Sequence, residues 1–147
     1  MSPQEAELDL VWAAGLFDGE GCITLHWRTS NACWVVQTSL AMTHEESVRR
    51  FASIIGVGNV NRVREATATA RAIWSWSTAS KQVEIALNRL VPYLFTKAPQ
   101  AQLALEARSL QFHRGGRGVP PSTLERMAEI AQRISQLNGL QNKRKVH

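Results

Sequence analysis

The stretch Ala13–Gly21, which reads AAGLFDGEG, governs the interpretation of the whole sequence. It continues an apolar segment whose hydrophobic residues recur at helical spacing, and it places two carboxylates, Asp18 and Glu20, among glycines. The earlier run Ser2–Glu5 has the pattern of a capping box, with proline in the first turn. We therefore expect a helix over residues 3–17 that ends at the glycines flanking Glu20, where glycine permits a positive φ.

The carboxylate of Glu20 needs a compensating charge, because the negative end of the preceding helix dipole points at it. The cation could be a lysine, an arginine or a divalent metal. A hard ion such as Mg²⁺ takes oxygen ligands and keeps several waters, so Glu20 and the Gly19 carbonyl could form one chain's share of a metal site. The competing interpretation is a solvated turn, which the spacing alone favours. The apolar, small-sided helix before the turn favours the metal.

Small residues on the same helix indicate a partner. Ala13, Ala14 and Gly15 would let the helix pack very closely against a two-fold copy of itself. Such a pair would bring two Glu20 side chains near one symmetry axis. We therefore expect a homodimer.

The rest of the chain alternates between strand and helix patterns. Period-two alternation predicts two hairpins, over residues 22–28 with 33–43 and over residues 59–65 with 71–78. Four further helices are predicted, over residues 44–55 after a Thr43 cap, 81–91 after Ser80, 98–112, and 123–137 between a Ser122 cap and Asn138-Gly139. This αββαββα order predicts an α+β fold, with a four-stranded antiparallel sheet and helices packed on one face.

Length and composition fit one domain over residues 1–147. Within it, residues 114–121 form a predicted Gly/Pro-rich linker before the last helix, and residues 139–147 a basic tail. The formal net charge of +5 and the pI of about 9.9 favour an anionic partner, of which nucleic acid is the commonest. Charge alone would equally fit a surface adapted only for solubility.

Other sequence features narrow the class of protein. The chain has no long uninterrupted apolar run, and its acidic, polar start does not fit a signal peptide. Its two cysteines, Cys22 and Cys33, are too few for a disulfide scaffold or a zinc site. We expect an intracellular protein, cytoplasmic or organellar and not secreted, with no membrane partner and no small-molecule cofactor.

The predicted sheet has a polar face that carries bases and almost no acids, which is unusual for an idle surface. We expect this face to bind double-stranded DNA through base edges and phosphates. The nominated residues are Thr24, His26, Arg28, Ser30, Gln37, Ser39, Asn61, Arg64 and Arg71. For any one of them a solvated side chain is as good an explanation as a base contact. Asn61 and Arg64 share a face only if their strand is bulged.

The five tryptophans are assigned to packing rather than to DNA stacking. Trp27 and Trp34 fall on apolar positions of their strands and are expected in the core. Trp74 and Trp76 share one face and are placed in the core too, with base contact as the alternative. Trp12 is expected between the first helix and the sheet.

With these features the sequence resembles the LAGLIDADG homing endonucleases, in their single-motif homodimeric branch. The stretch Ala13–Gly21 matches the nine-residue motif, with Ala13 in place of leucine and Glu20 in place of the commoner aspartate. The likeness covers roughly residues 8–140 and is further carried by GVG at 56–58, LVPYLFTK at 90–97 and QAQLALE at 100–106.

The resemblance implies a fold and an activity. Motif helices form the dimer interface, which would here contain Ala13, Ala14, Gly15, Leu16 and Asp18. The last acidic residue, Glu20, would bind Mg²⁺, or another divalent cation such as Mn²⁺, beside the scissile phosphates. The polar sheet faces of a saddle-shaped homodimer would lie in the major groove. The dimer would hydrolyse both strands of a long pseudo-palindromic DNA site and leave 3′ overhangs.

The resemblance also assigns roles to two residues outside the motif. Lys97 corresponds to the family's active-site lysine, which stabilises the phosphate or activates water; a solvated lysine at a helix end is the alternative. His44 falls where the family orders water near the metal, and it could do so or act as a base. A histidine simply exposed at a helix start explains it about equally well. Asp18 is left to bind backbone amides or the partner's helix end, and not metal.

Two other functional classes are weighed against a nuclease. One is a nucleic-acid-binding protein that does not cleave, such as an RNA maturase or a regulator on the same scaffold. It would have no chemical need for Glu20 or Lys97, so their presence favours the enzyme. The other is an unrelated α+β dimer with a small-molecule ligand, which no glycine-rich phosphate loop supports.

Overall fold

The computed structural model describes residues 1–111 and 119–141. Most of the predicted linker 114–121, and the basic tail beyond residue 141, lie outside the described residues. The elements in chain order are α1 (Pro3–Glu20), β1 (Gly21–Arg28), β2 (Cys33–Met42), α2 (Glu45–Ile55), β3 (Asn59–Arg64), β4 (Ile73–Ala79), α3 (Lys81–Leu90), the 3-10 helix η1 (Val91–Tyr93), α4 (Ala98–Gln111) and α5 (Pro121–Gln141). This order confirms the predicted α+β fold.

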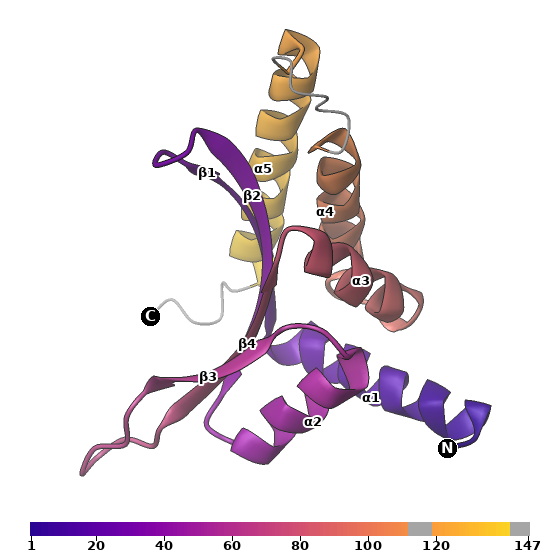
Figure 1. The fold of residues 1–147 in the computed structure, drawn as a ribbon, viewed down its shortest axis with the longest axis vertical. Coiled ribbons are helices and arrows are strands. Elements are labelled where there is room, and N and C mark those ends of the chain that lie inside the picture. Colours follow the sequence, from indigo (N-terminus) through magenta and orange to yellow (C-terminus); the bar gives the residue numbers. More distant parts are fainter. Residues whose placement is uncertain (112–118, 142–147) are drawn as a thin grey trace.

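The four strands form one antiparallel sheet in the order β1-β2-β4-β3. Pairing of β2 with β4 joins the two hairpins, with Leu40 opposite Trp76. Helices α1 to α4 lie on one side of the sheet, and α5 packs against β1 and α4 (Figure 1). The predicted packing of helices on one face is therefore confirmed. No helix of the described residues is long and apolar enough to cross a membrane.

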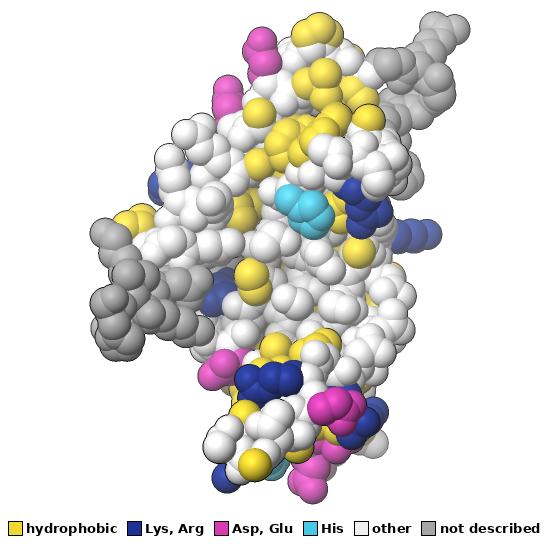
Figure 2. Space-filling view, turned by 90° about the vertical axis from the view of Figure 1, so that its left-hand side faces the viewer, with side chains coloured by type: hydrophobic (Ala, Val, Ile, Leu, Met, Phe, Trp, Pro, Cys, Tyr) yellow, Lys and Arg dark blue, Asp and Glu magenta, His cyan; other side chains and the backbone are white. Residues whose placement is uncertain are grey.

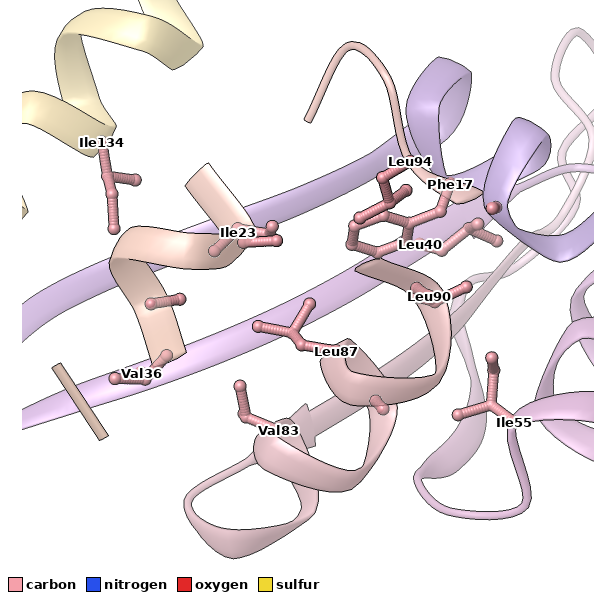
Figure 3. Packing of buried hydrophobic residues seen from close by; sticks show 14 of the residues in the cluster. Phe17, Ile23, Val36, Leu40, Ile55, Val83, Leu87, Leu90, Leu94 and Ile134 are labelled. Atoms are coloured by element: carbon pink, nitrogen blue, oxygen red, sulfur yellow. The ribbon is translucent and has the colours of Figure 1, made fainter. Parts of the chain in front are cut away.

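The core lies between helices α1 to α5 and the sheet, and its part around α1 and α2 fixes the end of α1. Phe17 of α1 stacks on Phe51 of α2 with ring centroids 6.1 Å apart, and both rings meet Trp76 of β4 edge-on. Phe17 also lies close to Leu40 of β2 and Leu94 (Figure 3). Because Phe17 is anchored from several sides, the carboxylates that follow it along α1 have a fixed position.

Helix α1 runs three residues past its predicted end, to Glu20. The next residue, Gly21, has an extended backbone with a φ of −77°. The prediction of positive-φ glycines at this exit is therefore wrong. Gly21 is needed for a different reason, since a Cβ there would collide with the ring of Phe17. Gly19 lies inside the helix, with open space where its Cβ would be.

The cap of α2 also differs from the prediction. His44, and not Thr43, is the capping residue: its Nδ1 accepts a hydrogen bond from the backbone N–H of Ser47. Thr43 lies one residue too early for this bond. The capping box at the start of α1 is present as predicted, because Ser2 and Glu5 each accept from the other's backbone N–H.

Helix α5 starts at Pro121, so Ser122 lies inside it and the predicted Ser122 cap is wrong. The predicted stop at Asn138-Gly139 is wrong too, because the helix continues to Gln141. Asn138 Nδ2 donates a hydrogen bond to the Ile23 carbonyl of β1, and Gln141 Nε2 donates to the Thr96 carbonyl. These tertiary hydrogen bonds hold the last turn, although an Asn-Gly pair ends many helices. They also tie α5 to the sheet edge and to the segment before α4.

The tryptophans are buried to different degrees. Trp76 is fully buried, as predicted, and Trp34 is half-buried. Trp27 is 46% exposed, so its placement in the core was wrong. Trp27 faces the predicted side of its strand and lies opposite Trp34, which it meets edge-on. It is exposed because it lies near the end of the hairpin. Trp74 is half-buried, with two guanidinium groups stacked on its ring.

Candidate functional site

The sheet face turned away from the helices, here called the open face, carries most of the nominated polar residues. The pairing register puts Thr24 of β1 opposite Gln37 of β2, and Ser39 lies two residues further along β2 on the same side. His26 and Arg28 continue the row along β1. These residues share one face because side chains alternate along each strand.

Strand β3 joins the open face through an irregularity in its pairing with β4. Asn61 lies opposite Ser75 and Arg64 opposite Ile73, with a register shift between Arg62 and Arg64. Because Ser75 and Ile73 point to the same side of β4, the shift turns Asn61 and Arg64 to the same face. The bulge that this pair required is therefore present.

The last two nominated residues lie outside the strands. Ser30 is exposed in the turn between β1 and β2. Arg71 is exposed just before β4, and its carbonyl accepts a hydrogen bond of 2.8 Å from Arg64 Nη2. Figure 1 shows these two hairpin connections at opposite ends of the sheet. The nominated residues thus follow the length of the open face.

Figure 2 views the molecule from the side of the open face. Backbone and uncharged polar side chains dominate the central part, with a histidine, basic side chains and some hydrophobic side chains among them, and acidic side chains lie toward the upper and lower ends. Among the described residues of the four strands, none that faces this way is Asp or Glu. Such a surface suits the hydrogen-bonding edges and phosphates of a nucleic acid.

Asp18, in the last turn of α1, anchors the segment before α4. Its Oδ2 accepts from the backbone N–H of Phe95 at 2.8 Å, and its Oδ1 accepts from the backbone N–H of Lys97 at 2.9 Å. Of the two roles left open by the sequence, the binding of backbone amides is the one that this chain makes. With both oxygens engaged in this way, Asp18 is a poor metal ligand.

Lys97 is held at the same helix end. Its side chain is buried, and Nζ donates a hydrogen bond of 3.1 Å to the Asp18 carbonyl. The last carbonyls of a helix lack partners within the helix and carry its negative dipole charge. The chain itself therefore supplies a cation at this end of α1, so the dipole alone does not require a metal. Burial also rules out a merely solvated lysine.

Glu20 closes α1 with an exposed side chain, and Gly19 before it is exposed too. In residues 1–111 and 119–141, no three His, Cys, Asp or Glu side chains gather into a cluster. An exposed carboxylate and a backbone carbonyl are hard oxygen donors of the kind that suits Mg²⁺ or Mn²⁺. They fit such an ion as one part of its shell, with the other oxygens coming from water, phosphate or a second chain.

The packing of α2 along α1 brings His44 toward the end where Glu20 lies. Arg50 Nη2 is 3.3 Å from Asp9 Oδ1, and the guanidinium covers the Trp12 ring at 4.3 Å from its centroid. A shallow hollow farther along the two helices is lined by Ala6, Leu10, Ser53 and Ile54. The helices thus run antiparallel, and the start of α2 lies toward the end of α1.

Helix α1 turns a stripe of apolar and small residues outward, defined here as Leu8, Val11, Gly15 and Gly19. Leu8 is 67% exposed and Val11 46% exposed. Nothing lies within 4 Å of the position of a Cβ at either glycine. Sequence reasoning missed Leu8 and Val11, although their helical spacing to Gly15 was a usable signal of a second apolar face.

The α1 stripe differs from the set of residues predicted for the dimer interface. Ala13 and Ala14 are fully buried in the chain's own core, so they have no surface to offer a second copy. Leu16 and Asp18 are half-buried at the flanks. Of the predicted set only Gly15 lies on the stripe, and the homodimer stays a prediction.

The fold is similar to that of solved homing endonucleases. I-CvuI in complex with its target has a TM-score of 0.73 and 22% identity, and the match covers 91% of this chain and 84% of that chain. The archaeal intron-encoded homing endonuclease I-Vdi141I, complexed with DNA, has a TM-score of 0.71 and 12% identity, with 89% and 84% covered.

A larger protein contains the same fold. The LAGLIDADG meganuclease I-AabMI, bound to uncleaved DNA, has a TM-score of 0.68 and 12% identity, and the match covers 83% of this chain but only 43% of that chain. No protein-family model and no curated protein matches the sequence. The likeness confirms, at the level of fold, the resemblance seen in the motif.

Proposed function

We propose that this chain, whose fold is that of the LAGLIDADG homing endonucleases, is a site-specific DNA endonuclease that works as a homodimer. The observation that carries the proposal is the end of α1. There an exposed carboxylate, Glu20, follows a helix with an outward apolar stripe, and a buried lysine, Lys97, is bonded to the same helix end. A protein that only bound nucleic acid would need neither group.

The open face binds the duplex. Its Arg and Gln side chains match the donor and acceptor pattern of guanine and adenine in the major groove, and the remaining basic groups contact phosphates. The solved structures of I-CvuI and I-Vdi141I with DNA support this role. Phosphate contacts give affinity, while base contacts give the preference for one site.

Glu20 and the Gly19 carbonyl would hold Mg²⁺ or Mn²⁺ at the cleavage centre. When bound, such an ion supplies Lewis-acid stabilisation of the charge that develops on the phosphate. I-CvuI was solved with 2 mM Mg and with 2 mM Ca, which supports divalent cations as ligands of this fold. Lys97 holds a positive charge nearby. It is positioned by the two hydrogen bonds that the Asp18 carboxylate accepts from backbone N–H groups.

The second copy completes the site. One chain offers Glu20 as its exposed motif carboxylate, and the α1 stripe offers an apolar surface on which a two-fold copy can pack. The match to less than half of I-AabMI supports pairing of two chains of this size. The dimer then carries one Glu20 for each DNA strand, cuts both strands of a pseudo-palindromic site and leaves 3′ overhangs.

The test separates cutting from binding. The protein is incubated with a randomised duplex library, with and without Mg²⁺, and the cut ends are sequenced. Glu20→Gln is expected to abolish cutting while it leaves binding to the selected site nearly unchanged, because it removes only a metal-binding charge. Glu46→Gln, at another exposed acid, is the matched control and should cut normally. Binding without any cutting by the wild type would identify a non-cleaving module on the same scaffold.

A further inference from the structure

We infer that His44 presents an N–H donor, and not a proton-accepting nitrogen, to the proposed cleavage centre. The inference rests on the proposed function for its location and on the cap of α2 for its chemistry. It decides between the two roles, ordering water or acting as a base, that the sequence left open.

The cap fixes which ring nitrogen of His44 carries the proton. Nδ1 accepts from the backbone N–H of Ser47 at 3.2 Å and lies 2.7 Å from the Ser47 hydroxyl oxygen. A backbone N–H can only donate, so Nδ1 must be the nitrogen with the lone pair. A neutral imidazole has one N–H, which is therefore on Nε2.

This tautomer has a chemical consequence. A histidine that acts as general base through Nε2 needs its lone pair there and its proton on Nδ1. That arrangement would turn the Nδ1 proton against the Ser47 N–H and break the cap, which would destabilise the start of α2. The capped His44 instead points an N–H outward, which suits a phosphate oxygen or an attacking water held by its lone pair.

The location of His44 follows from two neighbouring elements. In the sheet, Gly21, the residue after Glu20, lies opposite Leu40, so β2 passes the end of α1 four residues before the chain reaches His44. The antiparallel packing of α2 on α1 places the start of α2 toward that same end. The His44 side chain is exposed there.

Two matched pairs of variants test the inference, Asn against Asp and Gln against Glu at position 44. Within each pair the shape is the same, but only the amide has an N–H donor, and only the acid can act as a base. Asn and Asp also both serve well as helix caps. Single-turnover cleavage with protein in excess over DNA removes differences in affinity.

We expect the amide to cleave about 10²-fold faster than the acid in at least one pair, the usual scale for loss of one donor to a developing charge. Equal rates within both pairs, or a faster acid in one pair with no faster amide in the other, would overturn the inference. The first result would leave His44 as a cap only, and the second would make it a base.

A second measurement does not depend on cleavage. The ¹⁵N spectrum of the histidine side chains, assigned with His44→Asn, distinguishes the Nε2–H tautomer from the Nδ1–H tautomer at neutral pH. We expect Nε2–H, and the Nδ1–H form would refute the donor role. Failure of the proposed function would appear instead as absence of cutting by the wild type, with the tautomer unchanged.

Discussion

At the scale of single residues, Asp18 shows how a motif carboxylate can serve structure, while the proposed chemistry is assigned to its neighbour Glu20. It accepts backbone N–H bonds from Phe95 and Lys97, and its own carbonyl receives the Lys97 ammonium. One residue thus fixes both the backbone and the side chain of the buried lysine. Asp18 is therefore a positioning residue, and Glu20, which is exposed, is the carboxylate to which the proposed metal is assigned.

Replacement of Asp18 by Asn should destabilise the fold by about 2 kcal/mol, because bonds to a charged acceptor are lost and an amide N–H then faces a backbone N–H. Urea denaturation measures the change. Asp9→Asn is the control: it removes only the partly exposed ion pair with Arg50 and should cost less than about 1 kcal/mol. Equal losses in the two variants would contradict the anchoring role.

Cleavage gives Asp18→Asn a second readout. The variant should lower kcat more than it raises KM, because Lys97 loses its position while the open face stays intact. If Asp18 served only the stability of the fold, cooling the assay would restore the activity of the variant, because the folded fraction recovers.

At the scale of elements, local sequence signals predicted where most helices and strands lie but not where all of them end. Alternation alone placed Thr24, His26 and Arg28 on one side of β1. The ends of α1 and α5 depended on contacts between distant residues, the Phe17 ring against Gly21 and the Asn138 amide on the Ile23 carbonyl. No local pattern contains such contacts, so those boundaries were missed.

The interior position of Gly139 in α5 gives a stability prediction. Nothing lies within 4 Å of its would-be Cβ, and its φ is not positive, so Gly139→Ala should stabilise the protein by about 0.4–1 kcal/mol through helix propensity and a less disordered unfolded chain. Thermal unfolding measures it. Gly58→Ala, at φ +101° and against the Trp76 ring, should destabilise instead.

The contact between α4 and α5 predicts a pH dependence. Arg126 donates to both carboxylate oxygens of Glu106, at 2.6 and 2.9 Å, and these hydrogen bonds lower the pKa of Glu106 from its ordinary value of 4.5. Because the pKa of Glu106 is lower in the folded state than in the unfolded state, its ionised carboxylate stabilises the fold at pH values above the ordinary pKa. This contribution is lost as the pH falls through the folded pKa.

Glu106→Gln should therefore lower the Tm at pH 7, and its difference from the wild type should fade as the pH is lowered below the ordinary pKa of 4.5 and through the folded pKa. Thermal scans across this range measure the effect. Glu129 is the more exposed of the two carboxylates that Arg126 contacts, so Glu129→Gln should change the Tm less than Glu106→Gln does. A Glu106→Gln deficit that stayed constant with pH would contradict the ion pair as its cause.

At the scale of the whole molecule, the candidate site could be predicted only in part. The motif located Glu20, and the period-two pattern located the open face. The burial of Lys97 and the bulge at Val63 arise from tertiary packing and strand pairing, which the sequence does not display. The same holds for the α1 stripe, since both faces of that helix are apolar and only the structure distinguishes the core face from the exposed one.

Assembly gives the prediction at this scale. Gly15→Leu should leave the fold of one chain intact, because the space around its Cβ position is open, yet it should block the close approach of a second copy. Sedimentation velocity should show a dimer for the wild type and a monomer for the variant. Gly139→Leu, at another open helical glycine outside the stripe, should remain dimeric. A wild-type monomer that cuts both strands would contradict the paired arrangement.

The irregularity in β3 has an evolutionary consequence. Val63 lies where the register shifts and is 59% exposed, so its deletion removes little core packing. The loss of this one codon would restore regular pairing, with Arg62 opposite Trp74 and Arg64 opposite Ile73, and would keep Arg64 on the open face. A one-residue deletion at this point is therefore a length change that the gene can tolerate without loss of Arg64 from the open face.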